Sequence, residues 1–471
     1  RKHILAFDQD ESSKTKQRVN AAIFQFGRLL TRTKGQVKIA LWNGEDGKGI
    51  DDLIVNCGAN AFHEAIKDAP LFEQWLVRQY SALSYPPALE LNQRYLEGFT
   101  VPSDAEVVGI KAPKGTGKTE AIKRIVDRAS QERRKVLVLV HRVQLVQSIC
   151  DRVGLRSIYE LLNSREAKDK EQSSAISVEM DCMGYGLCID SLHPNSQAKF
   201  NADDWDGAIL IIDECEQVFK HLFNSTTCKD DRISILQTLA ALVQRIVYTG
   251  GQIILSDADL SDVSIDFVKG LSGCNIKPWI VTNNWKPQQP WQVTPYDSKE
   301  AWLLGIEAAI KAGDRVLVTV DSQKVRGRYS SYALETLWTK NFPDKKILRI
   351  DSETLELKSH PAFGCIGSGL DEVLKQYDIV VCSPSIETGV SIDLKGHFSS
   401  VWGSFSGSVP VDSASQALAR LREPVPRHIY VAPRGLHMIG RGETSVAALL
   451  KSENQLIKSK LHELQDAAND G

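Results

Sequence analysis

Several features typical of secreted, membrane-spanning or zinc-binding proteins are missing from this sequence. Its 471 residues include nine cysteines but no C-x-x-C pair, and Cys182 and Cys188 lack the companions that a zinc site needs. No apolar run approaches the ~18 residues of a membrane-spanning helix, and no signal peptide is found. We therefore expect reduced thiols, a cytoplasmic location and no membrane partner.

Strong charge of either sign is absent as well. The formal net charge of -2, with 42% apolar and 25% charged residues, is ordinary for a globular chain. This balance does not identify partners, because acidic surface elsewhere can mask a basic groove. At roughly one domain per 150 residues, the length predicts about three domains. The chain opens on Arg1 directly before a strand-like run, so we expect it to be a fragment of something longer.

The sequence does contain a glycine-rich turn, K-A-P-K-G-T-G-K-T at 111–119. An apolar run precedes it and an amphipathic helical pattern follows, which is the strand-to-helix context of a phosphate-binding loop. Gly115 and Gly117 have no Cβ, so backbone N–H groups can converge on phosphate oxygens. We predict that Lys118 reaches the β and γ phosphates of ATP and that Thr119 ligates Mg²⁺; a chance turn is the alternative. The predicted loop contacts are Lys114, Gly115, Thr116, Gly117, Lys118 and Thr119.

A pair of adjacent carboxylates follows about 95 residues downstream of that loop. Asp213 and Glu214 end the apolar run 208–212, which predicts a buried parallel strand. We predict that Asp213 holds the Mg²⁺ and that Glu214 orients and deprotonates the attacking water. After the next predicted strand, S-D-A-D at 256–259 is either a coupling segment or a simple turn.

A nucleic-acid contact is predicted where another apolar run, 136–140, ends on His141 and Arg142. Ligands bind beyond the carboxyl ends of strands in open parallel sheets, and a His-Arg pair there suits a phosphodiester backbone. A solvated loop is the alternative.

The N-terminal stretch carries a second acidic pattern. Asp8 and Asp10 follow a predicted strand, and K-G-I-D-D at 48–52 follows the strand 37–41. Carboxylates two residues apart at a strand end are suited to hold Mg²⁺. The pairing resembles the second half of a Toprim domain, the metal-binding module of primases and topoisomerases, whose glutamate would precede Arg1. The alternative is a remnant αβ unit with solvated acidic turns.

The remaining patterns give the domain plan. We expect a partial Toprim-like segment over 1–60, a helical linker over 61–99, a first P-loop domain over 100–285 and a second over 286–471. Trp75, Tyr80, Tyr85 and Tyr95 are expected to anchor the linker. The proline-rich stretch 275–297 shows no sustained periodicity and is interpreted as the crossover between the last two domains.

The ordered motifs resemble superfamily 2 helicases. To the loop, H-R, D-E-C-E and S-D-A the chain adds S-P-S-I-E-T-G-V-S-I-D at 383–393 and Q-A-L-A-R-L-R at 416–422. The nearest form is the herpesvirus origin-binding protein type, with G-V-S-x-D and Q-x-x-x-R-x-R. With the half Toprim in front, the whole resembles the cyanobacterial plasmid replication family in which a primase-like module precedes such a helicase.

The resemblance implies an α/β fold with two RecA-like P-loop domains, ATP between them and a DNA strand across both. It implies that Gly389 and Gln416 contact the nucleotide, and that Arg420 or Arg422 is an arginine finger. On a helix these two arginines diverge by about 200°, so only one would face the γ-phosphate. The implied DNA contacts, besides His141 and Arg142, are Ser191, Ser322, Ser383 and Thr388.

The expected function is an ATP-dependent DNA helicase or translocase in plasmid replication initiation, with ATP and Mg²⁺ as cofactors. Its expected partners are single-stranded or forked DNA and other replication proteins. Two alternatives stay open: an ATP-switched origin-binding or clamp protein that separates no strands, and part of a primase built on Asp8 and Asp10.

Overall fold

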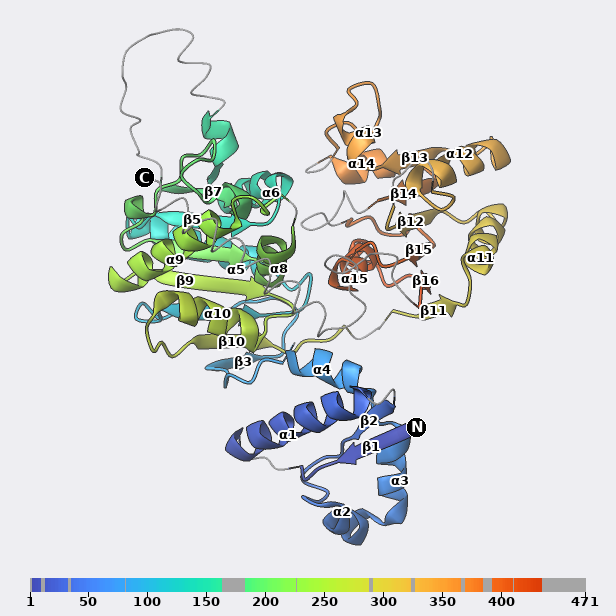
Figure 1. Cartoon of the computed structure of the whole chain (residues 1–471). Coiled ribbons are helices and arrows are strands. Elements are labelled where there is room, and N and C mark those ends of the chain that lie inside the picture. Colours follow the sequence, from blue (N-terminus) through green and yellow to red (C-terminus); the bar gives the residue numbers. More distant parts are fainter. Residues whose placement is uncertain are drawn as a thin grey trace, which may run out of the picture. The chain divides into compact units, whose positions relative to one another are not determined.

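The computed structural model divides the chain into two compact units, Arg1–Lys286 and Pro287–Gly471 (Figure 1). The described residues are 2–9, 13–32, 35–80, 82–162, 183–225, 227–287, 291–322, 327–365, 369–383, 392–409 and 411–433. Three predicted site residues, Asp10, Thr388 and Gly389, lie outside them. Within these ranges, no helix combines the length and apolar character that crossing a membrane requires.

The N-terminal part of the first unit is a strand–helix–strand element followed by short helices. Its elements are β1 (Lys2–Ala6), α1 (Ser13–Arg32), β2 (Gln36–Ala40), α2 (Ile50–Cys57), α3 (Ala59–Lys67) and α4 (Phe72–Tyr80). Strands β1 and β2 pair in parallel. Ile23, Ile39 and Trp75 are buried in a small core of their own, so the amphipathic period of α1 packs one face against β2.

The expected helix over 61–99 is wrong beyond Tyr80. Residues Leu89–Leu91 form strand β3, which pairs with a strand of the large sheet. Trp75 is buried as expected, whereas Tyr95 is 55% exposed and is therefore no core anchor. A three-residue strand is too short for a periodic pattern to reveal it.

The rest of the first unit is a parallel sheet covered on both faces. Its elements are β3, β4 (Val107–Lys111), α5 (Lys118–Gln131), β5 (Val136–Val140), α6 (Val143–Val153), β6 (Arg156–Ser157), β7 (Gly184–Cys188), η1 (Ile189–Ser191), η2 (Ala202–Asp204), β8 (Ile209–Asp213), α8 (Cys215–Asn224), α9 (Arg232–Tyr248), β9 (Gln252–Asp257), α10 (Asp262–Ser272) and β10 (Trp279–Asn283). The described strands lie in the order β3-β10-β4-β9-β8-β5-β7-β6.

Two apolar cores explain why the strands are almost wholly hydrophobic. Along β5, Leu137 and Leu139 pack with residues of α8, α9 and α10. Val136, Val138 and Val140 pack with residues of α5 and α6 on the opposite face. Successive side chains of a strand point to opposite faces, so both sets must be apolar when helices cover both.

The proline-rich stretch is more ordered than the sequence predicts. It contributes β10 to the first sheet and β11 (Val293–Tyr296) to the second. Pro295 lies within β11, which is an edge strand paired only with β16 among the described residues. Edge strands tolerate proline because the missing N–H can face away from the ladder.

The second unit repeats the architecture with a smaller parallel sheet. After β11 come α11 (Lys299–Lys311), β12 (Val316–Val320), α12 (Ser331–Asn341), β13 (Ile347–Ile350), α13 (Ser352–Glu356), α14 (Leu370–Leu374), β14 (Ile379–Cys382), β15 (Ser400–Phe405), α15 (Val411–Ala419) and β16 (Arg427–Val431). Their order is β11-β16-β15-β12-β14-β13. Trp302 and Trp338 are fully buried against one face. The predicted α/β class with two RecA-like parallel-sheet domains is confirmed.

The buried Arg427 side chain should contribute strongly to the stability of the second unit. It is fully buried, and its guanidinium donates to the carbonyls of Leu421 (2.6 Å), Glu423 (2.9 Å) and Val425. Burial lowers its pKa to about 10. Arg427→Met leaves these carbonyls without donors, and we expect the free energy of unfolding to fall by about 2–4 kcal/mol in urea denaturation.

Arg315→Met is the matched control. Arg315 is half exposed and its Nε lies 3.4 Å from Asp378 Oδ1, so its loss should cost less than about 1 kcal/mol. Equal destabilisation by the two variants would contradict the assigned role of Arg427.

Candidate active site

The predicted nucleotide-binding segments meet at the carboxyl edge of three neighbouring strands. In the parallel register Lys111 of β4 is opposite Asp257 of β9, and Ser256 of β9 is opposite Asp213 of β8. The glycine-rich loop, the S-D-A-D segment and the acidic pair therefore emerge side by side. This is the edge at which open parallel sheets bind ligands.

The loop has the backbone that the glycines predict. Gly115 (φ 73°) and Gly117 (φ 84°) adopt left-handed conformations, which cost glycine little. Thr116 Oγ1 donates to the Pro113 carbonyl at 2.7 Å. Lys118 begins α5 and its Nζ donates to the Ala112 carbonyl at 3.2 Å. The loop thus curls around its own lysine and presents the N-terminus of α5, which favours anions.

The acidic pair lies within reach of that lysine. Lys118 Nζ is 4.0 Å from Glu214 Oε1. Among the described residues, Asp213 Oδ1 and Glu214 Oε2 are buried and have no hydrogen-bond partner. Glu214 also holds a left-handed backbone (φ 50°) that is strained for a residue with a Cβ. Buried carboxylate oxygens without donors suit a hard cation such as Mg²⁺.

Burial dominates the electrostatics here. It raises the pKa of Asp213 and of Glu214, and the Lys118 ammonium opposes it in both cases. Burial likewise lowers the pKa of Lys114, while the charge of Glu214 raises it. A carboxyl whose pKa is raised towards neutrality is suited to act as a general base near pH 7.

Hydrogen bonds connect the D-E-C-E motif at 213–216, here called the acidic box, to the S-D-A-D segment. The sequence did not reveal this connection. Asp257 Oδ2 accepts the Glu216 N–H at 3.0 Å and its Oδ1 accepts the Asp259 N–H at 2.9 Å. Glu216 Oε1 accepts the Ser261 N–H (2.9 Å) and the hydroxyls of Ser261 and Ser264 (both 2.7 Å). The S-D-A-D segment is therefore more than a solvated turn.

A second missed feature is the segment beside the phosphate loop. The Arg94 guanidinium donates to the Gly115 carbonyl and lies over the rings of Tyr95 (4.8 Å) and Trp285 (4.6 Å). The Leu96 N–H donates to the Thr116 carbonyl at 2.8 Å. The exposed Tyr95 ring therefore lies next to the phosphate loop. The sequence did not predict this proximity.

The predicted nucleic-acid contacts of the first unit differ in exposure. His141, at the end of β5, is 5% exposed, and burial lowers its pKa to about 3. Arg142 is partly exposed at the start of α6. Ser191 ends η1, where its Oγ lies 3.3 Å from Tyr159 Oη. A neutral buried imidazole is a poor phosphate ligand, so this geometry favours Arg142 over His141.

In the N-terminal segment the structure brings the two acidic stretches together. The Gln9 N–H donates to the Lys48 carbonyl at 2.8 Å, and the Asp8 carboxylate lies beside Gly49. Asp52 Oδ2 accepts the Gly49 N–H at 3.1 Å. Metal binding by Asp8 stays a prediction.

Three predicted contact residues of the second unit lie after strands or on a helix, and two of them are buried. Ser322 follows β12, and Ser383 follows β14 with a fully buried side chain. Gln416 lies on α15 and is 9% exposed. In this conformation Ser383 offers no surface to a DNA strand, whereas Ser322 is partly exposed.

The helical placement of the two arginines is wrong. Helix α15 ends at Ala419, and Arg420 and Arg422 bracket Ile392 in an extended pairing. In an extended segment, residues two apart point to the same side, and the residue between them points to the other. Nevertheless, their surroundings differ: Arg420 is 6% exposed, whereas the Arg422 side chain is 45% exposed and its Nη1 lies 3.1 Å from Asp393 Oδ1.

Comparison with known proteins agrees with this geometry. Residues 80–233 match the model of the type III restriction enzyme res subunit, and residues 1–61 match a domain of unknown function, DUF3854. The replication origin-binding protein of varicella-zoster virus (strain Dumas) is 28% identical over 36% of this chain and 18% of its own length. The chain resembles the superfamily 2 helicases. The predicted resemblance to the origin-binding protein type is confirmed.

Two further matches span more of this helicase-like chain. An uncharacterized protein of Picosynechococcus sp. is 40% identical over 96% of this chain and 44% of its own length. The Mycobacterium smegmatis helicase Lhr, bound to ssDNA and AMP-PNP, is 15% identical with a TM-score of 0.43, covering 70% of this chain and 44% of that one. The chain thus spans less than half the length of each of these proteins.

The Asp257 carboxyl predicts a pH dependence of stability in this helicase-like unit. Burial, followed by the charge of Glu214, raises its pKa from 3.8 to about 7. Between these values the folded state holds a proton that the unfolded state has lost, so stability falls as the pH rises through the window. In protein free of nucleotide and Mg²⁺, Asp257→Asn should flatten the fall of the unfolding midpoint between about pH 4 and pH 7.

The exposed neighbour Asp259 is the control, and Asp259→Asn should keep the wild-type slope. A wild-type slope in Asp257→Asn would show that this carboxyl does not titrate in the window.

Proposed function

We propose that this chain is the ATP-hydrolysing motor of a DNA helicase or translocase that acts in plasmid replication initiation. The observation that carries the proposal is the meeting of Lys118, Asp213 and Glu214 at one sheet edge, with Lys118 Nζ 4.0 Å from Glu214 Oε1. A lysine on a phosphate loop and two buried carboxylates form the constellation that phosphoryl transfer to water requires.

The roles follow from chemistry and position. Lys118 and the N–H groups of the loop bind the phosphates, and Thr119 and Asp213 hold Mg²⁺, which offsets the charge of the phosphate oxygens when bound. Glu214 orients the attacking water and accepts its proton, a role favoured by its raised pKa. Two buried carboxylate oxygens without donors among the described residues support this assignment.

We assign binding of the nucleotide base to Tyr95 and Arg94, which lie beside the phosphate loop. Tyr95 is exposed, and the Arg94 guanidinium lies over its ring at 4.8 Å while donating to the Gly115 carbonyl. A planar cation–aromatic pair fixed to the phosphate loop offers a stacking surface for a purine. It would bind the base in substrate and transition state alike, and so affect affinity more than turnover.

Arg142 and the strand-end residues of both units are proposed to bind the DNA backbone. Movement along DNA requires two sets of contacts that shift relative to each other, and each unit offers one set. An arginine from the second unit that reaches ATP in the first would make hydrolysis depend on closure.

A second candidate function is an ATP-switched origin-binding protein that separates no strands. The similarity to the replication origin-binding protein of varicella-zoster virus favours this candidate. ATPase activity stimulated by single-stranded DNA together with unwinding of a tailed duplex supports the motor. ATP-dependent binding without unwinding supports the switch.

Variants of the phosphate loop and of the acidic box should separate nucleotide binding from ATP hydrolysis. Lys118→Ala removes a phosphate contact, and we expect weaker nucleotide binding as well as lost turnover. Glu214→Gln keeps shape and removes the base, so nucleotide affinity should stay within a few-fold while ATP hydrolysis falls by about 10²-fold or more. Steady-state ATPase assays and binding of a fluorescent ATP analogue provide the two readouts.

Glu120→Gln is the matched control, because Glu120 is an exposed carboxylate in the first turn of α5. It should keep wild-type turnover. If Glu214→Gln hydrolyses ATP at the wild-type rate, the assignment of the base is wrong.

The exposed arginine of the second unit is the better finger candidate. Arg422→Ala should lower DNA-stimulated turnover by about 10³-fold or more with little change in nucleotide affinity, since a finger contact forms on closure. Arg420→Ala should lower the stability of its unit instead, because its side chain lines an apolar pocket with Leu317 and Ile350. Normal turnover in both variants would show that another group completes the site.

A further inference from the structure

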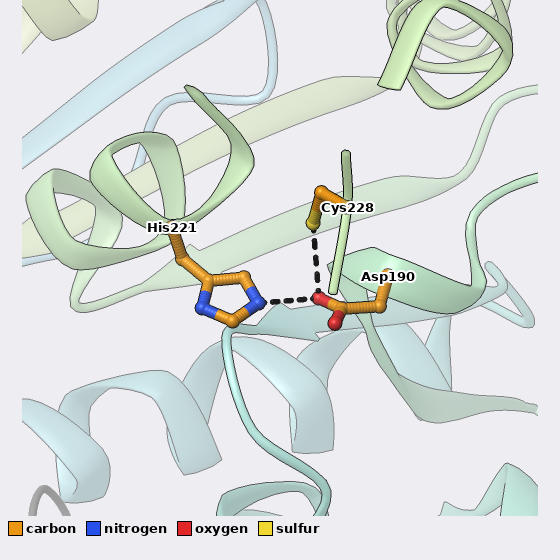
Figure 2. Close-up of side chains that lie close together, drawn as sticks. All are labelled: Asp190, His221 and Cys228. Carbon is orange, nitrogen blue, oxygen red and sulfur yellow. Dashed lines mark hydrogen bonds and ion pairs between the residues drawn. The ribbon is translucent and has the colours of Figure 1, made fainter. Parts of the chain in front are cut away.

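Three potential metal ligands converge in the first unit, away from the nucleotide-binding loop. Asp190, His221 and Cys228 place one ligand atom each within 4.8 Å of the other two (Figure 2). His221 Nε2 lies 2.6 Å from Asp190 Oδ1, and Cys228 Sγ donates to the same oxygen at 3.4 Å. Figure 2 shows the imidazole and the thiol both pointing at this carboxylate.

A fourth potential ligand, a second cysteine, lies next to them. Cys188, the last residue of β7, is 3% exposed and its Sγ donates to Asp190 Oδ1 at 3.7 Å. The sequence offered Cys188 no companion, because its partners come from α8 and from the loop that follows α8. One carboxylate oxygen therefore gathers two thiols and an imidazole.

We propose that Asp190, His221, Cys228 and Cys188 bind one Zn²⁺ ion. Two cysteines, a histidine and a carboxylate are a donor set that zinc accepts in tetrahedral geometry. Binding releases the thiol protons to solvent and forms two Zn–S bonds without any change of oxidation state.

The distances fit this geometry with a small adjustment. Tetrahedral bonds of about 2.0–2.3 Å place neighbouring N and O ligands about 3.3 Å apart, and S and O ligands about 3.5 Å apart. The Cys228–Asp190 separation of 3.4 Å already agrees, and that of Cys188 is 3.7 Å. His221 and Asp190, now 2.6 Å apart, must separate by less than about 1 Å. Cys188 lies outside the group of ligand atoms that are all within 4.8 Å of one another, so its side chain must also move towards His221 and Cys228.

The ligands are held in place by contacts outside the cluster. Thr227 Oγ1 donates to Asp190 Oδ2 at 2.5 Å, which fixes the carboxylate and leaves Oδ1 facing the cluster. Arg232 donates to the carbonyls of Leu222 and Ser225, both at 2.8 Å, and so holds the loop that carries Cys228. Such outer contacts orient metal ligands. His221 is 20% and Asp190 26% exposed, which gives an ion a path to the cluster.

The ion would join side chains from three segments of the first unit. It would link the end of β7, helix α8 and the loop before α9. Helix α8 begins directly after Glu214, and the His221 ring lies 6.0 Å from that of His141 at the end of β5. Zinc at this position would therefore brace the helix that carries the acidic box.

The experiment uses the full chain, stripped with a chelator and titrated with Co²⁺ and then Zn²⁺ in the absence of nucleotide. We expect one Co²⁺ per chain, a thiolate-to-cobalt charge-transfer band with tetrahedral d–d bands, and their loss when Zn²⁺ displaces Co²⁺. Zinc should also raise the unfolding midpoint, since a metal that binds only the folded state stabilises it.

Variants identify the ligands. Cys228→Ser should lose part of the charge-transfer band. The double variant Cys188→Ser/Cys228→Ser should lose all of it. Thr227→Ala should weaken Co²⁺ binding by about tenfold, as expected for a group that orients a ligand. Cys274→Ser, at a cysteine away from the cluster, should leave the spectrum unchanged.

Two results would overturn the proposal. One is folded wild-type protein that binds no stoichiometric Co²⁺ or Zn²⁺; the cluster would then be a hydrogen-bonded tether only. The other is a charge-transfer band that survives in the double variant, which would place the thiolate ligands elsewhere. Neither result depends on ATPase activity, so the outcome is independent of the proposed function.

Discussion

The parallel register of β4, β9 and β8 is the constraint on which the rest of this structure depends. A slip of one residue would turn each strand's side chains to the opposite face. The same register that sends Leu210 and Ile253 into one core and Ile211 and Ile254 into the other also aligns three strand ends. Hydrophobic packing, which is the dominant favourable contribution to folding, therefore sets the positions of polar groups that contribute nothing to it.

Those polar groups are held at an energetic cost. Burial disfavours the charged forms of Asp213, Glu214 and Asp257, whose pKa values are all raised. Glu214 adds a strained backbone at the same place. The first unit thus places several buried carboxyl groups beside its predicted phosphate loop, where a bound cation would change the electrostatic balance.

The sequence predicted what is local and missed what depends on strand order. An apolar run, a turn residue and the following helix lie within one short segment, so the loop at 111–119 and the acidic pair were found. The contact of Glu216 with Ser261, and that of Asp190 with Cys228, join residues that are far apart in the sequence and follow different strands. No short-range pattern shows which strands are neighbours. The end of α15 was missed for the same reason, because Leu421 pairs with the distant Ile392.

Glu216, where the chain departs from the familiar helicase motifs, has a structural role. The residue replaces the last position of the D-E-A-D and D-E-x-H forms, and its carboxylate accepts three donors from the start of α10. Its N–H also donates to Asp257. The backbone of Glu216 is therefore joined to the S-D-A-D segment, and its side chain to the start of α10. Movement of the acidic box relative to the start of α10 would break the three hydrogen bonds that the Glu216 carboxylate accepts. These contacts fix the start of α10 relative to the acidic box and the S-D-A-D segment.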